Sequence, residues 1–405
     1  MKRLLSWRPA LLGVYAGEFF LESAVAAIIP ILPLFLRDRG TSYSLLGLIV
    51  GANLVGQFLF QFPAGRLADR FGRRTVMVGA LAVAAVMTFA LVLPVPTEWL
   101  IAFRFLQGAG TAAFLPGANA LIADEVPAER RGAAYGWLSS AGAAGFAFGP
   151  VIGGVIALIS RSAVLEAIGA ALVLDALVVL ALVQQRHPPT AARRAQRGGF
   201  GGLSRVELQV LVAVAAASIG AGFLFGTYNS VWGLFMNRLG ATDWQIGLSF
   251  TTFSLPFMVV APFAGRLADR LDRRWLLVGA LVVAGLMAPV YPIVGNVLLI
   301  LLISPIEGIA LTFFDTALPA LVMDVAPEHR RATTQGALGA FMYAAEAVGS
   351  FAGATLFAQG LRVPFVVGSA ICVLSVLASV PLFLAAGRPQ RVALQTSESP
   401  GERPL

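Results

Sequence analysis

The sequence predicts an all-α membrane protein, with twelve transmembrane helices arranged as two six-helix bundles related by pseudo-symmetry. The first observation is composition: of 405 residues, 58% are hydrophobic and only 12% charged, with mean hydropathy +0.82. An average soluble domain has about 25% charged residues. The second is a recurrence of apolar stretches of about 20 residues, the length of a membrane-spanning helix. The third is an internal repeat. These features exclude a soluble enzyme and a disordered chain, and the single cysteine excludes an intrachain disulfide.

Twelve spans are expected along the chain. In order they are residues 9–36, 42–63, 75–95, 98–123, 132–158, 163–185, 207–236, 242–263, 275–295, 297–323, 332–358 and 363–386. Pro and Gly inside these spans are tolerated, because neighbouring helices satisfy the freed backbone groups. A polar stretch rich in Pro, Gly and Arg divides the spans into two sets of six. We therefore expect bundles over 1–185 and 207–387, a cytoplasmic linker over 186–206 and a cytoplasmic tail over 388–405.

The basic residues predict the orientation. Of the 29 Lys and Arg residues, 23 fall on the side of the N terminus and five on the opposite side. Cytoplasmic loops carry the excess of basic residues, so both termini are expected in the cytoplasm, with the chain in the cell membrane. The net charge of +8 is explained by this topology and does not indicate a nucleic-acid partner. The first span lacks a small-residue cleavage site and is expected to stay as a membrane helix.

The two halves of the chain are copies. The segment AGRLADRFGRR begins at Ala64 and AGRLADRLDRR begins at Ala264. Residues 120–131 (ALIADEVPAERR) and 320–331 (ALVMDVAPEHRR) match at the same shift of 200 residues. Parallel repeats of six helices imply two bundles related by an axis along the membrane normal, an architecture that supports alternating access to a site near the midplane.

Several motifs resemble those of the major facilitator superfamily. The segment GRLADRFGRR (65–74) is similar to the signature loop that joins helices 2 and 3 in this family, and its second copy would join helices 8 and 9. RFLQGAG (104–110) resembles the helix-4 motif, and IIPILPLFL (28–36) resembles the drug:proton antiporter group. The fifth span reproduces the spacing G-x8-G-x3-GP-x2-GG of proton-coupled exporters, with Gly136, Gly145, Gly149, Pro150, Gly153 and Gly154. Over its whole length the chain resembles the twelve-helix drug:proton antiporters.

The resemblance implies a conformational latch at the 65–74 segment and its copy. Asp69 would meet the cytoplasmic end of helix 11, and Arg73 would pair with an acid at the end of helix 4, here Asp124. We expect these contacts to stabilise the outward-facing state, although the arginines also suffice as a topology signal alone. The expected latch residues are Gly65, Asp69, Arg70, Arg73, Asp124, Gly265, Asp269, Arg273 and Asp324.

The fifth span leaves two interpretations open. Gly145, Gly149 and Gly153 are spaced four apart, which lets two helix backbones approach closely. Simple packing explains these glycines. Pro150 removes a backbone donor and can bend the helix, so gating at the interface between the halves is the other interpretation.

Ionisable residues inside the spans point most directly to function, because a charge near the bilayer centre costs at least about 2.5–3.5 kcal/mol. The resemblance implies that helices 1, 4, 7 and 10 line a central cavity. The candidates on these helices are Glu18, Glu22, Arg104, Glu307 and Asp315. We expect Glu22 and Glu307 to carry protons, with Glu18 and Asp315 as further candidates and Arg104 steadying a carboxylate or the backbone. Outside these helices, Asp175 is expected to be structural and Glu346 is left undecided.

The seventh span adds Tyr228, Asn229 and Trp232. Aromatic and amide groups beside a cavity suit amphipathic or cationic organic molecules. Ordinary packing between helices explains the same residues.

The sequence thus favours a secondary active transporter that exports small drug-like, lipophilic or cationic molecules by proton-coupled alternating access. Its expected partners are the substrate, protons and the bilayer, and we expect a monomer without cofactor or metal. A symporter or exporter of a sugar or amino-acid derivative is the alternative. An intramembrane enzyme is a distant one, since the sequence has no HExxH signature. The only lysine is Lys2, which excludes a Walker loop.

Overall fold

The computed structural model describes residues 9–127, 130–183, 204–326 and 331–386. Within these ranges the regular structure is twelve α-helices, as the sequence predicts. They are α1 Pro9–Asp38, α2 Tyr43–Phe71, α3 Arg73–Ala90, α4 Trp99–Glu125, α5 Arg131–Ile156, α6 Arg161–Leu182, α7 Arg205–Arg238, α8 Asp243–Arg270, α9 Arg273–Val294, α10 Val297–Val325, α11 Arg331–Phe357 and α12 Val363–Ala385.

Eleven of these helices are long and apolar enough to cross a membrane. The twelfth, α4, has 27 residues, enough to span a bilayer at 1.5 Å per residue. It falls short only in composition, since polar side chains such as Arg104 and Gln107 interrupt its apolar sequence. Helix α4 packs against α2 and α3, and both of these polar side chains are buried inside the protein, where they border its central cavity rather than lipid. The chain is a multi-pass membrane protein.

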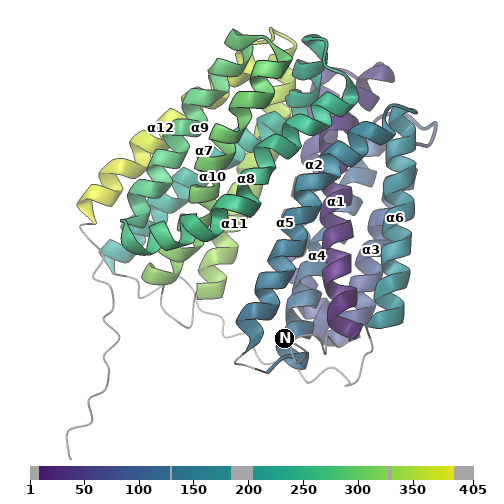
Figure 1. The fold of residues 1–405 in the computed structure, drawn as a ribbon, viewed down its shortest axis with the longest axis horizontal. Helices are drawn as coiled ribbons and strands as arrows, with labels where there is room; N and C mark the ends of the chain where they lie inside the picture. Colours follow the sequence, from purple (N-terminus) through teal and green to yellow (C-terminus); the bar gives the residue numbers. More distant parts are fainter. Residues whose placement is uncertain (1–8, 128–129, 184–203, 327–330, 387–405) are drawn as a thin grey trace, which may run out of the picture.

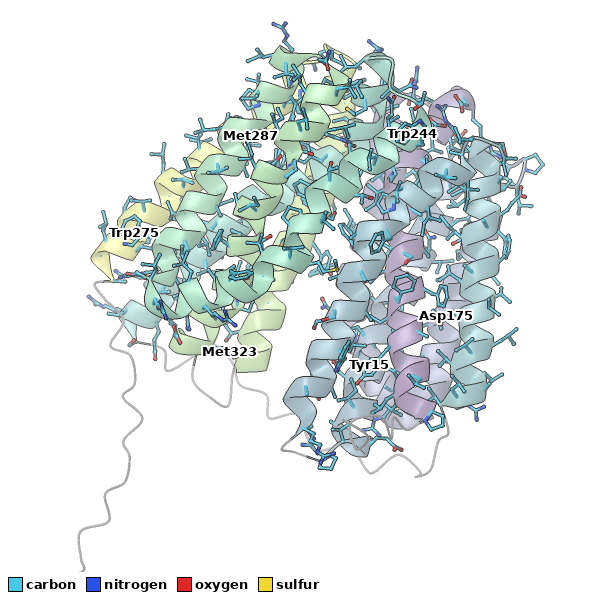
Figure 2. All side chains as sticks on the ribbon, viewed as in Figure 1. Tyr15, Asp175, Trp244, Trp275, Met287 and Met323 are labelled. Carbon is cyan, nitrogen blue, oxygen red and sulfur yellow. The ribbon has the colours of Figure 1, made fainter. Side chains whose placement is uncertain are left out.

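The helices form two bundles, α1–α6 and α7–α12, which lie side by side (Figure 1). In this view the bundles converge at the end opposite the N terminus and diverge at the end where the N terminus lies. Side chains fill each bundle (Figure 2). The expected linker, 186–206, lies almost entirely outside the described residues, and so does the tail, 388–405.

The segment expected as a loop over 65–74 is mostly helical, which corrects the prediction. Helix α2 continues to Phe71, and only Gly72 separates it from α3. Gly72 has φ +89°, a backbone region that favours glycine and allows a sharp turn here. The second copy has Asp272 instead, with φ −74°, and its side chain caps α9 by accepting a hydrogen bond from the Arg274 amide at 3.1 Å. The turn between α2 and α3 therefore depends on a glycine with positive φ, whereas the equivalent turn between α8 and α9 depends on an aspartate that caps the following helix.

The third span was expected to end near residue 95, whereas α3 ends at Ala90. The following residues form turns up to the start of α4. Pro94 and Pro96 explain the earlier end, because proline cannot donate a helical hydrogen bond and disfavours helical backbone in the residue before it.

The halves touch at pseudo-symmetric glycines. A Cβ added at Gly47 of α2 would lie 2.9 Å from the Ser350 carbonyl oxygen and 2.8 Å from Phe351 Cα, both on α11. A Cβ at Gly247 of α8 would clash with the Pro150 carbonyl oxygen of α5. Glycine at these two positions, 200 residues apart, therefore permits the close contacts of α2 with α11 and of α8 with α5.

Hydrogen bonds between described residues of the two halves lie near the converged end. Arg161 binds Asp243, Arg238 Nη2 donates to the Tyr43 hydroxyl at 3.0 Å, and Thr251 donates to the Ala147 carbonyl at 2.7 Å. These residues come from the last part of odd-numbered helices or the first part of even-numbered ones. The converged end is therefore joined by polar contacts as well as by close backbone packing.

Candidate functional site

A central cavity of about 840 Å³ lies between the two bundles. Helices 1, 4, 7 and 10 contribute to its wall, as the resemblance implies, but α2, α5, α8 and α11 contribute as well. Among the described residues, its acidic lining residues are Glu18, Glu22, Asp315 and Glu346, and its only basic one is Arg104. Aromatic side chains, among them Phe146, Phe225, Tyr228, Phe257 and Tyr343, provide much of the remaining surface. Four carboxyl groups against one guanidinium make this a site suited to a cationic or proton-bearing solute.

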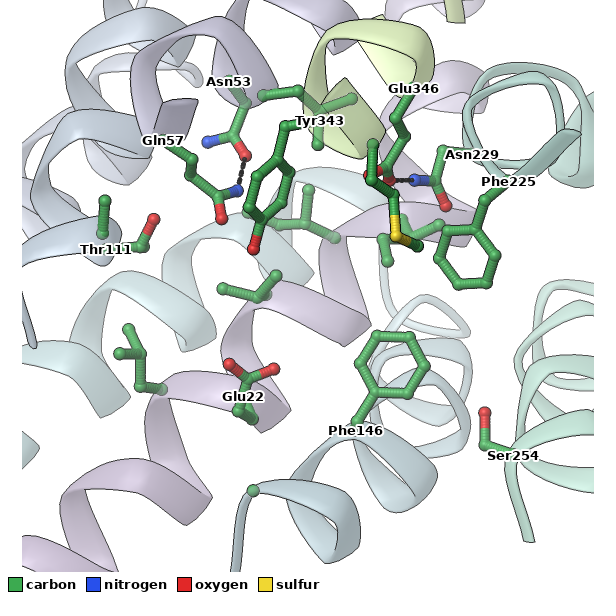
Figure 3. Close-up of a pocket in the computed structure, with 18 of the residues that line it drawn as sticks. Glu22, Asn53, Gln57, Thr111, Phe146, Phe225, Asn229, Ser254, Tyr343 and Glu346 are labelled. Atoms are coloured by element: carbon green, nitrogen blue, oxygen red, sulfur yellow. Dashed lines mark hydrogen bonds between the residues drawn. The ribbon is translucent and has the colours of Figure 1, made fainter. Parts of the chain in front are cut away.

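Glu18 and Glu22 lie one helical turn apart on α1 and both border the cavity. The Glu22 carboxyl group points into open space between the helices (Figure 3). Glu18 is buried, and its Oε2 atom has no hydrogen-bond partner among the described residues. Both side chains lie against α5: a Cβ added at Gly142 would be 3.1 Å from Glu18 Oε1 and 3.5 Å from Glu22 Cγ. Because Gly142 has no side chain, α5 leaves room for the carboxyl groups of Glu18 and Glu22.

Arg104 was expected to steady a carboxylate or the backbone. The structure instead directs its Nη1 to the side-chain oxygen of Gln107, one turn further along α4. The Gln107 amide in turn donates to Thr88 of α3 at 2.6 Å. No carboxylate among the described residues forms an ion pair with Arg104. Its positive charge is therefore held in the wall of the N-terminal half by neutral partners.

The wall of the C-terminal half contains Glu346, which the sequence left undecided. Its Oε1 accepts a hydrogen bond from Asn229 Nδ2 at 2.8 Å, which joins α11 to α7 (Figure 3). Tyr343 lies one turn before Glu346 and also lines the cavity. Sequence reasoning missed Tyr343, and its only sequence signal was a polar aromatic residue inside a span.

Glu307 does not line the cavity. It is 1% exposed and lies behind Tyr228, whose hydroxyl donates to Glu307 Oε1 at 3.1 Å. Tyr291 of α9, a residue that the sequence did not single out, donates to Oε2 at 2.6 Å. Both oxygens of this carboxyl group are therefore occupied by phenol groups, and Tyr228 alone of the three residues borders the cavity.

Trp232 was expected beside the cavity, and the structure corrects this placement. Its ring is buried against Tyr291 at a centroid distance of 4.8 Å, and its indole nitrogen donates to Ser249 at 2.8 Å. It does not line the cavity. One turn of helix separates Trp232 from Tyr228, and only Tyr228 reaches the lumen.

Asp175 of α6 is fully buried within the N-terminal bundle (Figure 2). Neither of its carboxyl oxygens has a hydrogen-bond partner among the described residues. It does not line the cavity, and its expected structural role stays a prediction.

The motif of the fifth span serves two interfaces. A Cβ at Gly145 or Gly149 would lie 2.9 Å from Ser23 backbone atoms of α1, and one at Gly153 would lie 3.0 Å from Ala27 Cβ. Gly154 faces the other half, where a Cβ would lie 2.6 Å from the Asp243 carbonyl oxygen. The first three glycines therefore pack α5 on α1, while Gly154, together with the Pro150 carbonyl facing Gly247, packs α5 on α8.

The basic residues of the expected latch pair within their own halves. Arg73 Nη1 lies 2.7 Å from Asp124, the ion pair that the resemblance implies, and Arg273 Nη1 lies 2.5 Å from Asp324. Each pair joins the start of one helix, α3 or α9, to the end of the next. Arg70 lies over the ring of Phe71, at 5.2 Å from its centroid.

The structure describes the remaining latch residues only in part. The side chains of Asp69 and Asp269 lie outside the described part of the structure, as does the environment of Gly65. Gly65 and Gly265 both fall inside helices, and a Cβ at Gly265 would meet only Thr316 Cγ2, at 3.9 Å.

Two pseudo-symmetric bundles of membrane-spanning helices around a shared cavity, mostly apolar but with several carboxyl groups in its wall, define a transporter of small molecules, not an enzyme. A sequence model of the Major Facilitator Superfamily matches residues 14–228 and 214–404. The chain therefore belongs to this superfamily.

Its relatives include drug efflux proteins. It is 29% identical over 285 residues to the multi-drug resistance efflux pump PmrA of Streptococcus pneumoniae, covering 68% of this chain and 71% of that protein. It is 28% identical over 294 residues to the multidrug resistance protein MdtG of Enterobacter lignolyticus, covering 70% of each. The quinolone resistance protein NorA of Staphylococcus aureus is 26% identical over 227 residues, covering 55% of this chain and 57% of NorA.

Solved transporters share the fold. A bacterial homologue of the human lysosomal transporter Spinster, in an inward-facing and unoccupied conformation, aligns with a TM-score of 0.76 at 18% identity, over 93% of this chain and 97% of that one. The nucleoside transporter NupG aligns with a TM-score of 0.76 at 13% identity, over 92% of this chain and all (100%) of NupG.

Proposed function

We propose that the chain exports small lipophilic or cationic organic molecules in exchange for protons, by alternating access to the central cavity. The observation that carries this proposal is the cavity wall, with four carboxyl groups, one arginine and a rim of aromatic rings. Aromatic faces and carboxylates together attract organic cations. The drug-efflux relatives support the same substrate class and the same direction.

The orientation follows from the distribution of basic residues. With 23 of them on the side of the N terminus, both termini lie in the cytoplasm of a cell that carries the protein in its cell membrane. The converged end, which contains the Arg161–Asp243 pair, then faces outside. The structure in this orientation corresponds to an inward-facing state, from which a cytoplasmic substrate can enter the cavity. We further propose that the protein works as a monomer, because each chain contains a complete cavity.

The proposed proton carriers are Glu22 and Glu307, with Glu18 and Asp315 as additional candidates. Glu22 and Asp315 can meet a substrate in the cavity directly. Glu307 cannot, since Tyr228 lies between it and the lumen. Arg104 contributes a fixed positive charge that favours the ionised form of nearby carboxyl groups, whereas repulsion among the carboxylates limits how many ionise at once.

The latch residues are proposed to set the conformational balance. The Arg73–Asp124 and Arg273–Asp324 pairs fix the cytoplasmic ends of α3 with α4 and of α9 with α10. Asp69 and Asp269 would then join the halves when the cytoplasmic end closes. Exposed ion pairs contribute about 0–1 kcal/mol each, so the latch would tune the equilibrium between states.

The test is transport by the purified protein in proteoliposomes with an imposed pH gradient. A fluorescent organic cation should move against its own gradient, out of the compartment into which protons flow. An uptake symporter would instead accumulate the substrate in the compartment that receives the protons. A protein that ignores the pH gradient would contradict proton coupling.

A further inference from the structure

The structure encloses a carboxyl group that the cavity reaches only through one side chain. Glu307 accepts hydrogen bonds from Tyr228 and Tyr291, and of these three residues only Tyr228 borders the lumen. Among the described residues, the thiol of Cys372 on α12 is a further titratable group that interacts electrostatically with Glu307; it is buried and lies 3.4 Å from the Gly220 carbonyl oxygen. On α8, the backbone of Phe253 and the ring of Pro256 lie against the next residue, Gly308, and neither titrates.

The two tyrosines are not equivalent. Tyr291 is fully buried, its bond to Glu307 is the shorter one at 2.6 Å, and its ring is held edge-on by Trp232. Tyr228 also packs on Trp232 and Phe365, at centroid distances of 5.4 and 6.1 Å, but its hydrogen bond to Glu307 is longer, 3.1 Å, and one side of it borders the cavity. A change in the charge of Glu307 is therefore expected to move Tyr228 rather than Tyr291.

Two phenol O–H groups directed at the two oxygens suit an ionised carboxylate, which only accepts hydrogen bonds. When Glu307 is protonated, one of its oxygens becomes a hydroxyl, which is a donor and only a weak acceptor, so the phenol at that oxygen is held less strongly. The internal repeat shows that the two halves differ here, because the residue equivalent to Glu307 in the N-terminal half is Gln107. Gln107 is already bonded to Arg104 and Thr88 and cannot titrate. The switchable group is thus confined to one half.

We propose that Tyr228 is a positioning residue that transmits substrate binding to Glu307, so that substrate and proton compete without touching. Ionised Glu307 anchors the Tyr228 hydroxyl in the wall and leaves the ring face available to a bound cation. Proton binding to Glu307 weakens this hold on the hydroxyl, and the ring can then enter the volume that the substrate needs. A bound substrate keeps the ring in the wall, which favours loss of the proton. This inference rests on the proposed proton-coupled export.

The test compares two substitutions that each remove one hydrogen bond from the same carboxyl group. Tyr228→Phe keeps the ring and its packing but cannot hold the carboxylate, whereas Tyr291→Phe removes the other bond without altering the cavity wall. Proton release on binding of tetraphenylphosphonium to purified protein is measured with a pH-indicator dye in weakly buffered detergent solution. Glu307→Gln provides the level of release that remains without this carboxyl group.

Wild type and Tyr291→Phe should release the same number of protons per cation bound, and Tyr228→Phe should release as few as Glu307→Gln. The dissociation constant of tetraphenylphosphonium should show the same pattern. When one proton is exchanged per cation bound, this constant changes about tenfold per pH unit in wild type. Tyr228→Phe should lose the part of this pH dependence that comes from Glu307. At high pH, where Glu307 is ionised, Tyr228→Phe should bind within about threefold of wild type, which a misfolded variant would not.

Three results would overturn the proposal, and they can be told apart. Full proton release by Tyr228→Phe, with reduced release by Glu307→Gln, would mean that Glu307 is coupled by another route. Equal losses in Tyr228→Phe and Tyr291→Phe would mean that the number of hydrogen bonds matters and the position of Tyr228 does not. No proton release by wild type would contradict proton coupling itself, and the role of Tyr228 with it.

Discussion

Arg161 at the start of α6 forms two hydrogen bonds with Asp243 at the start of α8, from Nε to Oδ2 at 3.0 Å and from Nη2 to Oδ1 at 2.9 Å. The pair joins the two halves of the molecule. The remaining nitrogen, Nη1, binds the Asp38 carboxylate at the end of α1, at 2.8 and 3.0 Å. One guanidinium therefore connects three helix ends at the converged face.

We predict that Arg161→Gln shifts the protein toward states that are open at this face. A bidentate ion pair of this kind contributes about 1 kcal/mol, so its loss changes the equilibrium about fivefold. Distances between spin labels at Ile159 and Leu298, both highly exposed at this face, measure the open population. Arg362→Gln removes an exposed charge from the same face and should leave the distances unchanged. Equal shifts for both variants would mean that net charge, not the Arg161–Asp243 pair, holds this face closed.

The motif of the fifth span yields a second prediction, about stability. A methyl group at Gly149 would meet the Ser23 backbone of α1, with Cα at 2.9 Å, whereas one at Gly136 would meet nothing within 4 Å. Overpacking of this kind costs about 1–3 kcal/mol. Gly149→Ala should therefore lower the melting temperature in detergent and the yield of folded protein. Gly136→Ala, in the same motif and helix, should match wild type or exceed it slightly.

Gly154 of the same motif should behave differently, because its neighbours belong to the other half. A Cβ there would lie 2.6 Å from the Asp243 carbonyl oxygen and 2.8 Å from Trp244 Cα. The clash disappears when the halves separate at this face. Gly154→Ala should thus leave the melting temperature close to that of wild type and raise the open population seen by the Ile159–Leu298 labels. A large loss of stability without a change in that population would assign Gly154 to packing within one half.

The sequence predicted the fold almost completely. Twelve apolar spans and a repeat with a constant shift of 200 residues determine the number of helices and their division into halves, because both depend on period and length alone. The errors occur where local chemistry overrides hydropathy. Helix α2 continues through charged residues to Phe71, and α3 ends ahead of Pro94. A hydropathy pattern does not register either effect.

The site was predicted less well, for a reason that Glu307 illustrates. Its helix and depth follow from the sequence, but which side of the helix faces the lumen depends on rotation and on neighbours from other spans. Tyr228 and Tyr291, which are 63 residues apart in the chain, both bind this carboxyl group. Their spacing in the sequence does not predict that contact. The predicted placement of Trp232 beside the cavity was wrong for the same reason, since Trp232 lies one turn from Tyr228 and yet packs in the bundle interior.

A fourth prediction concerns orientation. Single cysteines at Thr97 and Asn296, which lie at the converged end, should react with a membrane-impermeant thiol reagent added to intact cells. A cysteine at Ala192, in the linker outside the described residues, should react only after the membrane is permeabilised. The native Cys372 is buried and provides a low background. Reaction at Ala192 in intact cells would reverse the proposed orientation and the assignment of the open side.

The last prediction separates proton coupling from substrate binding. Glu22→Gln and Glu307→Gln keep the shape of the side chain but fix it in a neutral state, so the protein should no longer exchange a proton for the substrate at that position. Each variant should still exchange labelled organic cation for unlabelled cation across a liposome membrane, with Glu307→Gln needing a higher cation concentration because its neutral side chain holds Tyr228 less strongly. Accumulation driven by a pH gradient should fall at least tenfold. Both assays are carried out in the same proteoliposomes, so that differences in reconstitution cancel.

The matched control for these variants is Asp175→Asn. Asp175 is as deeply buried as Glu307 but does not border the cavity, and its carboxyl oxygens have no hydrogen-bond partner among the described residues. Its neutral substitute should therefore retain gradient-driven accumulation within about twofold of wild type. Full accumulation by both Glu22→Gln and Glu307→Gln would show that neither carries the coupled proton, and a loss in Asp175→Asn as large as theirs would place the carrier in the N-terminal bundle, away from the cavity.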